Sequence, residues 1–76
     1  MPTIITIGNL KIQIFADDHN PPHFHVVTPE REALIRMSDL SLLAGALSGR
    51  EFKIAVQWAQ EHRKEIEDEW NRLNAR

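Results

Sequence analysis

The sequence contains no cysteine, and it has no long apolar run. Without cysteine the chain forms no disulfide, no thiolate zinc site and no cysteine nucleophile. No stretch approaches the ~20 apolar residues that a membrane-spanning helix requires. The N-terminal residues 1–5 lack the basic start and the longer apolar segment of a signal peptide. These absences predict a cytoplasmic protein that does not associate with membranes.

Charge and length narrow the range of functions further. The net charge of −2 gives no general attraction to nucleic acid or to anionic lipid, and the arginines do not cluster, so nucleic acid has little support as a partner. Glycine-rich phosphate loops and the short motifs of serine hydrolases and zinc proteases are absent from the sequence. With 76 residues there is room for one core only, which predicts a single domain over residues 1–76.

The first half of the chain has the pattern of β-strands. Strands are predicted in four segments, 4–7, 10–15, 23–28 and 32–37. Gly8-Asn9, between the first two, is a two-residue hairpin signal. The stretch 40–47 is apolar but contains Gly45, and both a short strand and an irregular connection are compatible with it.

The second half has the pattern of one long helix. Ser48 and Glu51 have the spacing of a capping box at its start. Eight residues then recur at three- and four-residue steps: Phe52, Ala55, Val56, Ala59, His62, Ile66, Trp70 and Leu73. A helix over about 49–75 would be roughly 40 Å long, whereas a chain of this size has a radius of gyration of about 11 Å. Its last turns should therefore protrude or pack on another molecule.

Together these segments predict an α+β fold. The expected architecture is a small antiparallel sheet of three to five strands over about 3–47, packed against one long C-terminal helix over about 49–75. Two apolar residues near the end of that helix, Trp70 and Leu73, predict a protein partner or a homo-oligomer that associates through the helix.

The most distinctive segment is a histidine-rich loop. Its candidate functional residues are Asp17, Asp18, His19, Asn20, His23 and His25. On a strand, His23 and His25 would point to the same face, and His19 could fold back toward them from before the two prolines. His19, His23 and His25, with an oxygen from Asp17 or Asp18, would suit zinc or another divalent transition metal with an open position.

Two other interpretations of this loop stay open. Aspartate, asparagine and proline are common in turns, so one interpretation is a structural loop or a recognition element for a protein. Paired histidines are also able to act as general acid and base without a metal. His62 lies on the apolar stripe of the helix, where it is either a core histidine or a further member of the histidine group.

The run from Phe15 to Val26, with His-Asn-Pro-Pro-His-Phe-His at its centre, resembles the bacterial family of domains of unknown function numbered 4160. The similarity continues through Gly45 and Leu47 and then through Trp58, His62-Arg63 and Trp70. Ser48-Gly49 stands where relatives commonly have a proline. The family has no established activity. Its members often occur beside another small protein in an arrangement that resembles toxin–antitoxin pairs, which implies a protein partner or a DNA-linked regulatory role.

Three functions follow as hypotheses. The first is a small interaction module that works with a partner protein or as a homodimer, in a toxin–antitoxin-like pair. The alternative is a metal-dependent hydrolase or nuclease that uses His19, His23 and His25 as ligands. The third is a metal-free ribonuclease-like site, for which the sequence offers no evident cation to hold phosphate. Whether the Pro21-Pro22 bond is cis does not follow from the sequence.

Overall fold

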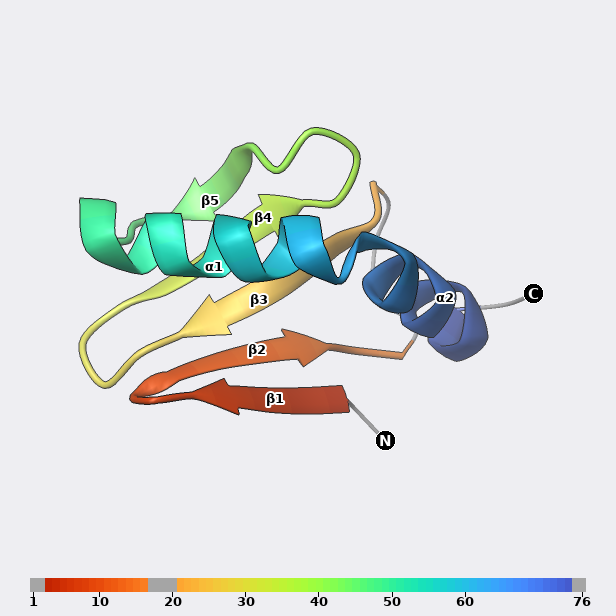
Figure 1. Cartoon of the computed structure of the whole chain (residues 1–76), viewed down its shortest axis with the longest axis horizontal. Helices are drawn as coiled ribbons and strands as arrows, with labels where there is room; N and C mark the ends of the chain where they lie inside the picture. The colour runs from red at the N-terminus through yellow and green to blue at the C-terminus, as the bar shows by residue number, and fades with distance from the viewer. Residues whose placement is uncertain (1–2, 17–20, 75–76) are drawn as a thin grey trace.

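The computed structural model describes residues 3–16 and 21–74 of the chain. Five strands are followed by two helices: β1 (Thr3–Ile7), β2 (Leu10–Ile14), β3 (His23–Val27), β4 (Glu32–Arg36), β5 (Leu42–Gly45), α1 (Gly49–Glu61) and α2 (Arg63–Asn74). The strands form one antiparallel sheet in chain order, so each pairs with its neighbour in sequence (Figure 1). The α+β class and the antiparallel sheet are confirmed.

The first hairpin follows from its turn residues. Ile7 pairs with Leu10 across Gly8-Asn9, and Gly8 has φ +59° while Asn9 is not in the left-handed region. Glycine at the first central position is what a type II′ turn requires. The twist of such a turn matches that of the flanking strands, and the β1–β2 register runs without a shift.

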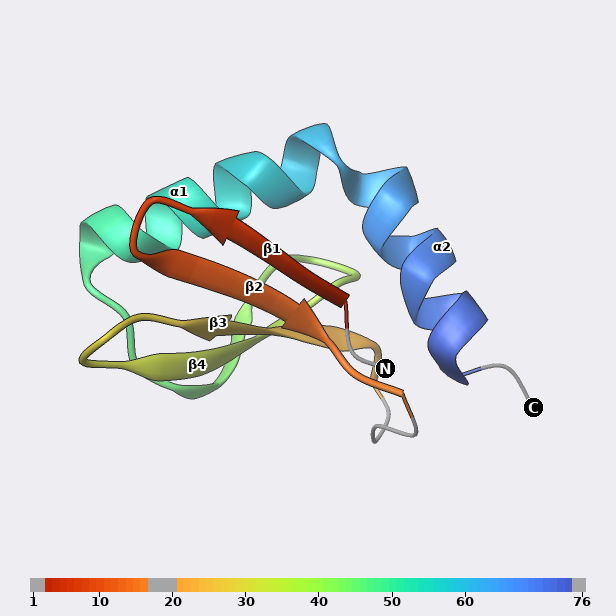
Figure 2. The same ribbon diagram turned by 90° about the horizontal axis from the view of Figure 1, so that it is seen from below.

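Helix α1 covers one face of the sheet, and the alternation of the strands supplies the core beneath it (Figure 2). Buried residues of β2, β3 and β4 meet the buried small residues of α1 at Ala55 and Ala59. The core also takes in Ile66 and Trp70 of α2; its strand and turn members are Leu10, Ile12, Ile14, Phe24, Val26, Ile35, Met37 and Leu40. The other face of the sheet, which carries His23 and His25, is not covered by α1.

The ambiguous stretch 40–47 contains a strand. Leu42–Gly45 pairs with β4, with a register shift at Leu34/Ile35. Leu40 precedes it with φ +59°, and Gly45 ends it with φ +79°. A Cβ on Gly45 would collide with the Glu32 carbonyl oxygen, so glycine is required there for both its backbone angle and its lack of a side chain.

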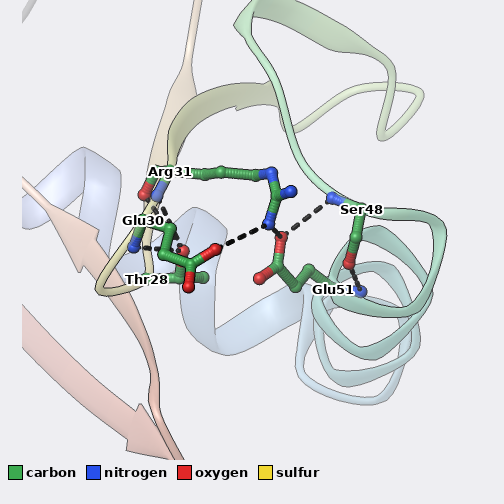
Figure 3. Close-up of polar contacts among 5 residues, drawn as sticks. All are labelled: Thr28, Glu30, Arg31, Ser48 and Glu51. Carbon is green, nitrogen blue, oxygen red and sulfur yellow. Dashed lines mark hydrogen bonds and ion pairs between the residues drawn. The ribbon is translucent and has the colours of Figure 1, made fainter.

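The capping box at the start of α1 is confirmed. The Ser48 hydroxyl accepts from the Glu51 backbone N–H at 3.1 Å, and the Ser48 backbone N–H donates to the Glu51 carboxylate at 2.8 Å (Figure 3). Arg31, in the β3–β4 loop, lies 3.6 Å from the same carboxylate. Hydrogen bonds from Ser48, with Arg31 nearby, lower the pKa of Glu51. The helix start is thereby tied to the hairpin loop.

The prediction of one long helix is wrong, because the helix breaks at His62. His62 has φ −121° and ψ 26°, outside the helical region, and its Nδ1 donates to the Trp58 carbonyl oxygen at 2.8 Å. The His62 backbone N–H donates to the same carbonyl at 3.0 Å, so the side chain shares this acceptor and the main-chain bond is kept. Beyond the break, α2 turns past the end of the sheet (Figure 2). The molecule is 35 Å long with a radius of gyration of 11.4 Å. A straight helix of ~40 Å would extend past its end, and the bend keeps the last turns against the sheet.

The bend also removes the expected apolar patch at the helix end. Trp70 is 5% exposed and Ile66 is 1% exposed, while Leu73 is half-buried and packs against the core. The Asn74 side-chain amide donates to the Phe15 carbonyl oxygen at 3.0 Å, which fastens the end of α2 to the end of β2. Within residues 3–16 and 21–74, the helices are too short and too polar to cross a bilayer.

Candidate functional site

Four rings form a row at the end of the sheet where α2 passes. Phe15 meets His25 edge-on with ring centroids 4.6 Å apart. His25 and His23 follow with centroids 5.3 Å apart, and Trp70 of α2 lies 5.4 Å beyond His23. The two histidines lie on one face because they are two residues apart on β3, as the sequence predicts. We refer to Phe15, His25, His23 and Trp70 as the ring row.

His23 anchors the segment that precedes its own strand. The residue is 5% exposed, and its Nδ1 donates to the Pro21 carbonyl oxygen at 2.8 Å. The next carbonyl, that of Pro22, accepts from the Met37 backbone N–H at 2.9 Å. Two prolines offer no backbone donors, so these accepted bonds are how the segment is held in place.

His25 is in a different position. Its side chain is 18% exposed, and its Nδ1 lies 3.7 Å from a carboxylate oxygen of Glu32 on the adjacent strand. Val27 pairs with Glu32 and His25 with Leu34, so His25 and Glu32 are diagonal neighbours on the open face.

His62, the other predicted site residue among those that the structure describes, is not brought to this place. His62 stacks on Trp58, with centroids 4.5 Å apart and planes inclined by 15°, and its described contacts do not include the ring row. Asp17, Asp18, His19 and Asn20 lie outside the described residues. Over residues 3–16 and 21–74, no group of three or more histidine, aspartate or glutamate side chains could hold a metal ion.

Beside the ring row is a groove of about 400 Å³ between α2 and the β4–β5 turn. Its lining residues are Pro22, Met37, Ser38, Arg63, Glu67, Trp70 and Asn71. We call it the α2 groove. Its walls combine apolar side chains with one guanidinium and one carboxylate, the mixture typical of sites that orient a ligand by a few polar contacts.

Arg63 is the cation of the α2 groove. One of its terminal nitrogens donates to the carbonyl oxygens of Met37 and Ser38, at 3.3 and 3.2 Å. No described carboxylate lies within 4.0 Å of it, including that of Glu67 one turn further along the helix. Within the described part of the chain, the polar groups that face its positive charge are therefore two carbonyl dipoles.

The turn that forms the other wall is internally braced. Arg36 donates two hydrogen bonds to the Asp39 carboxylate, at 3.0 and 2.7 Å. The backbone N–H and hydroxyl of Ser41 donate to the same group, at 3.1 and 2.7 Å. The hydrogen bonds from Arg36, and after them those from Ser41, hold the pKa of Asp39 well below its usual range. The wall at Met37 and Ser38 is thus presented by a turn with little freedom.

Sequence reasoning missed the α2 groove as a site. Met37, Ser38 and Arg63 carry no motif of their own, and they meet where α2 begins, directly after the bend at His62. Arg63 and Trp70 are, however, among the residues on which the family resemblance rests.

The family assignment is now open to test by comparison with known proteins. A model of a domain of unknown function, DUF4160, matches residues 9–71. The chain belongs to the DUF4160 family. The match confirms the resemblance seen in the sequence and spans the ring row from Phe15 to Trp70 together with the whole α2 groove. Neither the curated proteins nor the solved structures include a match to this DUF4160 chain.

Proposed function

We propose that this DUF4160 protein is a cytoplasmic interaction module whose α2 groove receives a segment of a partner protein. The observation that carries the proposal is Arg63, a cation in a partly apolar groove whose described hydrogen-bond partners are carbonyl oxygens alone. A partner segment with an acidic side chain next to an apolar one fits this chemistry, because carboxylates bond guanidinium groups strongly and with defined geometry.

The surroundings of the groove support recognition of a partner. Pro22 offers rigid, exposed apolar surface, and Trp70, which is 5% exposed, lines the groove behind it. Rigid surface binds at a low cost in conformational entropy. Both are held in place, Pro22 by the Met37 N–H and Trp70 by the ring of His23. A groove with prearranged walls suits a short segment of another chain. The family resemblance points to the other protein of a toxin–antitoxin-like pair as one source of that segment.

Selection from a library of random heptapeptides tests the proposal without knowledge of the partner. We expect the native protein to enrich peptides that carry aspartate or glutamate beside an aromatic or aliphatic residue. Arg63→Gln should abolish the acidic preference, and Arg63→Lys should keep part of it because the charge remains.

Arg50 supplies the matched control. It is an exposed arginine near the start of α1, away from the α2 groove, so Arg50→Gln should leave the selected peptides unchanged. An acidic preference that survives Arg63→Gln, or one that disappears with Arg50→Gln, would show that the groove is not the binding site.

A second candidate function, a metal site at the histidines, has one specific observation in its favour. His23 donates from Nδ1 to a backbone carbonyl, and histidines that bind metals commonly have one ring nitrogen oriented by such a bond. His25 lies beside it on the same face. With His19 as a third ligand, the site would take zinc or a similar divalent ion and activate water for hydrolysis.

Metal content of protein purified without a histidine tag, with zinc and manganese titrated into the metal-free form, separates the two candidates. The metal hypothesis requires one bound ion per chain, lost on His25→Gln and on His19→Gln, while Arg63→Gln leaves it unchanged. No bound metal and no thermal shift on addition of either ion would eliminate it, and would leave the peptide-binding proposal untouched.

A further inference from the structure

Strand β1 (Thr3–Ile7) is an open edge of the sheet. Among residues 3–16 and 21–74, its one pairing is with β2. In a two-residue hairpin, the two residues that flank the turn exchange two backbone hydrogen bonds. Along the strands, hydrogen-bonded pairs then alternate with pairs that are not hydrogen-bonded to each other. Ile7, Ile5 and Thr3 thus bond to β2, which leaves the backbone groups of Ile4 and Thr6 directed away from the sheet. Ile4 is 53% exposed, the largest value among the large hydrophobic residues described.

The other edge, β5, is protected and β1 is not. Sheets block unwanted pairing with short strands, bulges, charges or prolines at their edges. Strand β5 has four residues, a register shift against β4 and a left-handed glycine at its end. Residues 3–7 contain no charge and no proline, and their register with β2 is regular. Of the two edges, β1 is the one suited to accept another strand.

A second groove, of about 380 Å³, runs beside this edge and is distinct from the α2 groove. Its apolar lining is Ile5, Ile14, Trp58 and Ile66, and its charged lining is Glu65, Asp68, Glu69 and Arg72. The charged lining has three carboxylates and one guanidinium. The guanidinium bonds to Glu69 at 2.6 Å, and Asp68 pairs with the exposed Lys64 at 3.4 Å, outside the lining. The groove beside β1 therefore has an apolar floor and an acidic rim.

We propose that β1 accepts an extended segment of a partner protein as a sixth strand, with lysine or arginine side chains in the groove. Alternate side chains of an added strand would enter the groove. A lysine or arginine there would lay its aliphatic stem on the apolar floor and place its charge at the rim. Residues between them would lie beside Ile4 on the open face. The site is independent of the proposed function at the α2 groove.

The acidic lining of the groove favours a basic partner segment over a second copy of this chain. Two copies paired through β1 would place Thr3–Ile7 of one against the groove of the other, and that strand carries no charge. Glu65 would then gain no cationic partner, and Asp68 would keep only its ion pair with Lys64 at 3.4 Å, whereas a basic segment adds cations beside both carboxylates.

Synthetic ten-residue peptides test the proposal, one of alternating valine and lysine and one of alternating valine and glutamate. With the valine–lysine peptide, we expect slower hydrogen exchange of the Ile4 and Thr6 amides, and binding that weakens as salt is raised. The valine–glutamate peptide should not bind. Glu65→Gln with Asp68→Asn should weaken binding of the lysine peptide by about tenfold.

Two lysine substitutions form a matched pair of variants. Ile4→Lys places a like charge on the open edge and should abolish binding, with Thr6→Lys as a second variant at the same edge. Ala44→Lys adds the same charge to β5, where the residue is also exposed, and should leave binding intact. Protection at the β5 amides, or equal binding of both peptides, would overturn the proposal. Self-association without peptide that Ile4→Lys removes would assign the edge to a second copy instead.

Discussion

The imidazole of His23 lies against the indole of Trp70, with ring centroids 5.4 Å apart and planes inclined by 51°. Both residues are 5% exposed. His23 is the first residue of strand β3 and Trp70 belongs to helix α2, so their contact packs the last helix against the end of the sheet. Because His23 also bonds to the Pro21 carbonyl, the same contact sets the position of the proline segment that borders the α2 groove.

Trp70→Ala should lower the free energy of unfolding by about 3–5 kcal/mol, the usual cost of removing a large buried aromatic side chain. Trp70→Phe should cost less, because most of the apolar contact remains. Urea denaturation followed by circular dichroism measures both. Lys53→Ala, at an exposed position of α1, is the control and should change stability by no more than about 0.5 kcal/mol.

A double-mutant cycle isolates the contact between the two rings. His23→Ala, Trp70→Ala and the double variant should give a coupling energy of about 0.5–1.5 kcal/mol, the range for adjacent ring pairs. Additive effects would mean that each ring stabilises the fold without help from the other.

Gly45 and Gly8 should differ sharply in their tolerance of asparagine. Both have positive φ, but a Cβ at Gly8 meets no atom within 4 Å, whereas one at Gly45 collides with the backbone of Glu32 and Ala33. Asparagine is among the residues that adopt positive φ most readily. We therefore expect Gly8→Asn to cost about 1 kcal/mol and Gly45→Asn on the order of 3 kcal/mol or more. Thermal unfolding of the two variants side by side measures the difference, and equal losses would contradict the collision.

The helix cap should respond to substitutions at Ser48. Ser48→Ala removes the acceptor for the Glu51 N–H and should cost about 1 kcal/mol, whereas Ser48→Asp should retain most of the stability. Glu51→Ala should cost at least as much, since it also removes the contact with Arg31 (Figure 3). Chemical denaturation gives these values. A Ser48→Ala variant as stable as the native protein would mean that water satisfies the helix start equally well.

Acid should destabilise the protein through Asp39. Folding lowers the pKa of this carboxyl below its unfolded value of about 3.9. Its stabilising contribution is therefore fully present above pH ~3.9, and it is lost as the pH falls toward the folded pKa. Asp39→Asn and Arg36→Gln should each flatten the acid side of the stability profile. Urea midpoints from about pH 5 down to about pH 2 test this, and an unchanged acid slope in both variants would exclude the pair as its source.

The elements were predictable from the sequence where their signals are local. Gly8-Asn9 defines the first hairpin, alternation places His23 and His25 on one face, and Ser48 with Glu51 marks the start of α1. Strand β5 was ambiguous, because four residues that end in a left-handed glycine leave little periodic pattern.

The bend at His62 was not predictable, and much of the candidate site depends on it. Neither proline nor glycine stands there, and the apolar stripe continues through it at helical spacing. The bend depends on tertiary packing, in which Ile66 and Trp70 find cover at the end of the sheet. Arg63, the first residue of α2 after the bend, donates to the carbonyls of Met37 and Ser38, and Glu67, Trp70 and Asn71 further along α2 complete the α2 groove.

Because of the break at His62, helix α2 should detach from the sheet and reattach independently of the rest of the fold. Within α2 only Ile66 and Trp70 are buried, so the segment should detach at a lower free energy than global unfolding, as small cooperative units do. Amides of α2 would then exchange with solvent sooner than those of the central strands. Arg63, Glu67, Trp70 and Asn71 all belong to this segment and to the α2 groove. A ligand of that groove would therefore slow exchange along the entire final helix, well beyond the residues it touches.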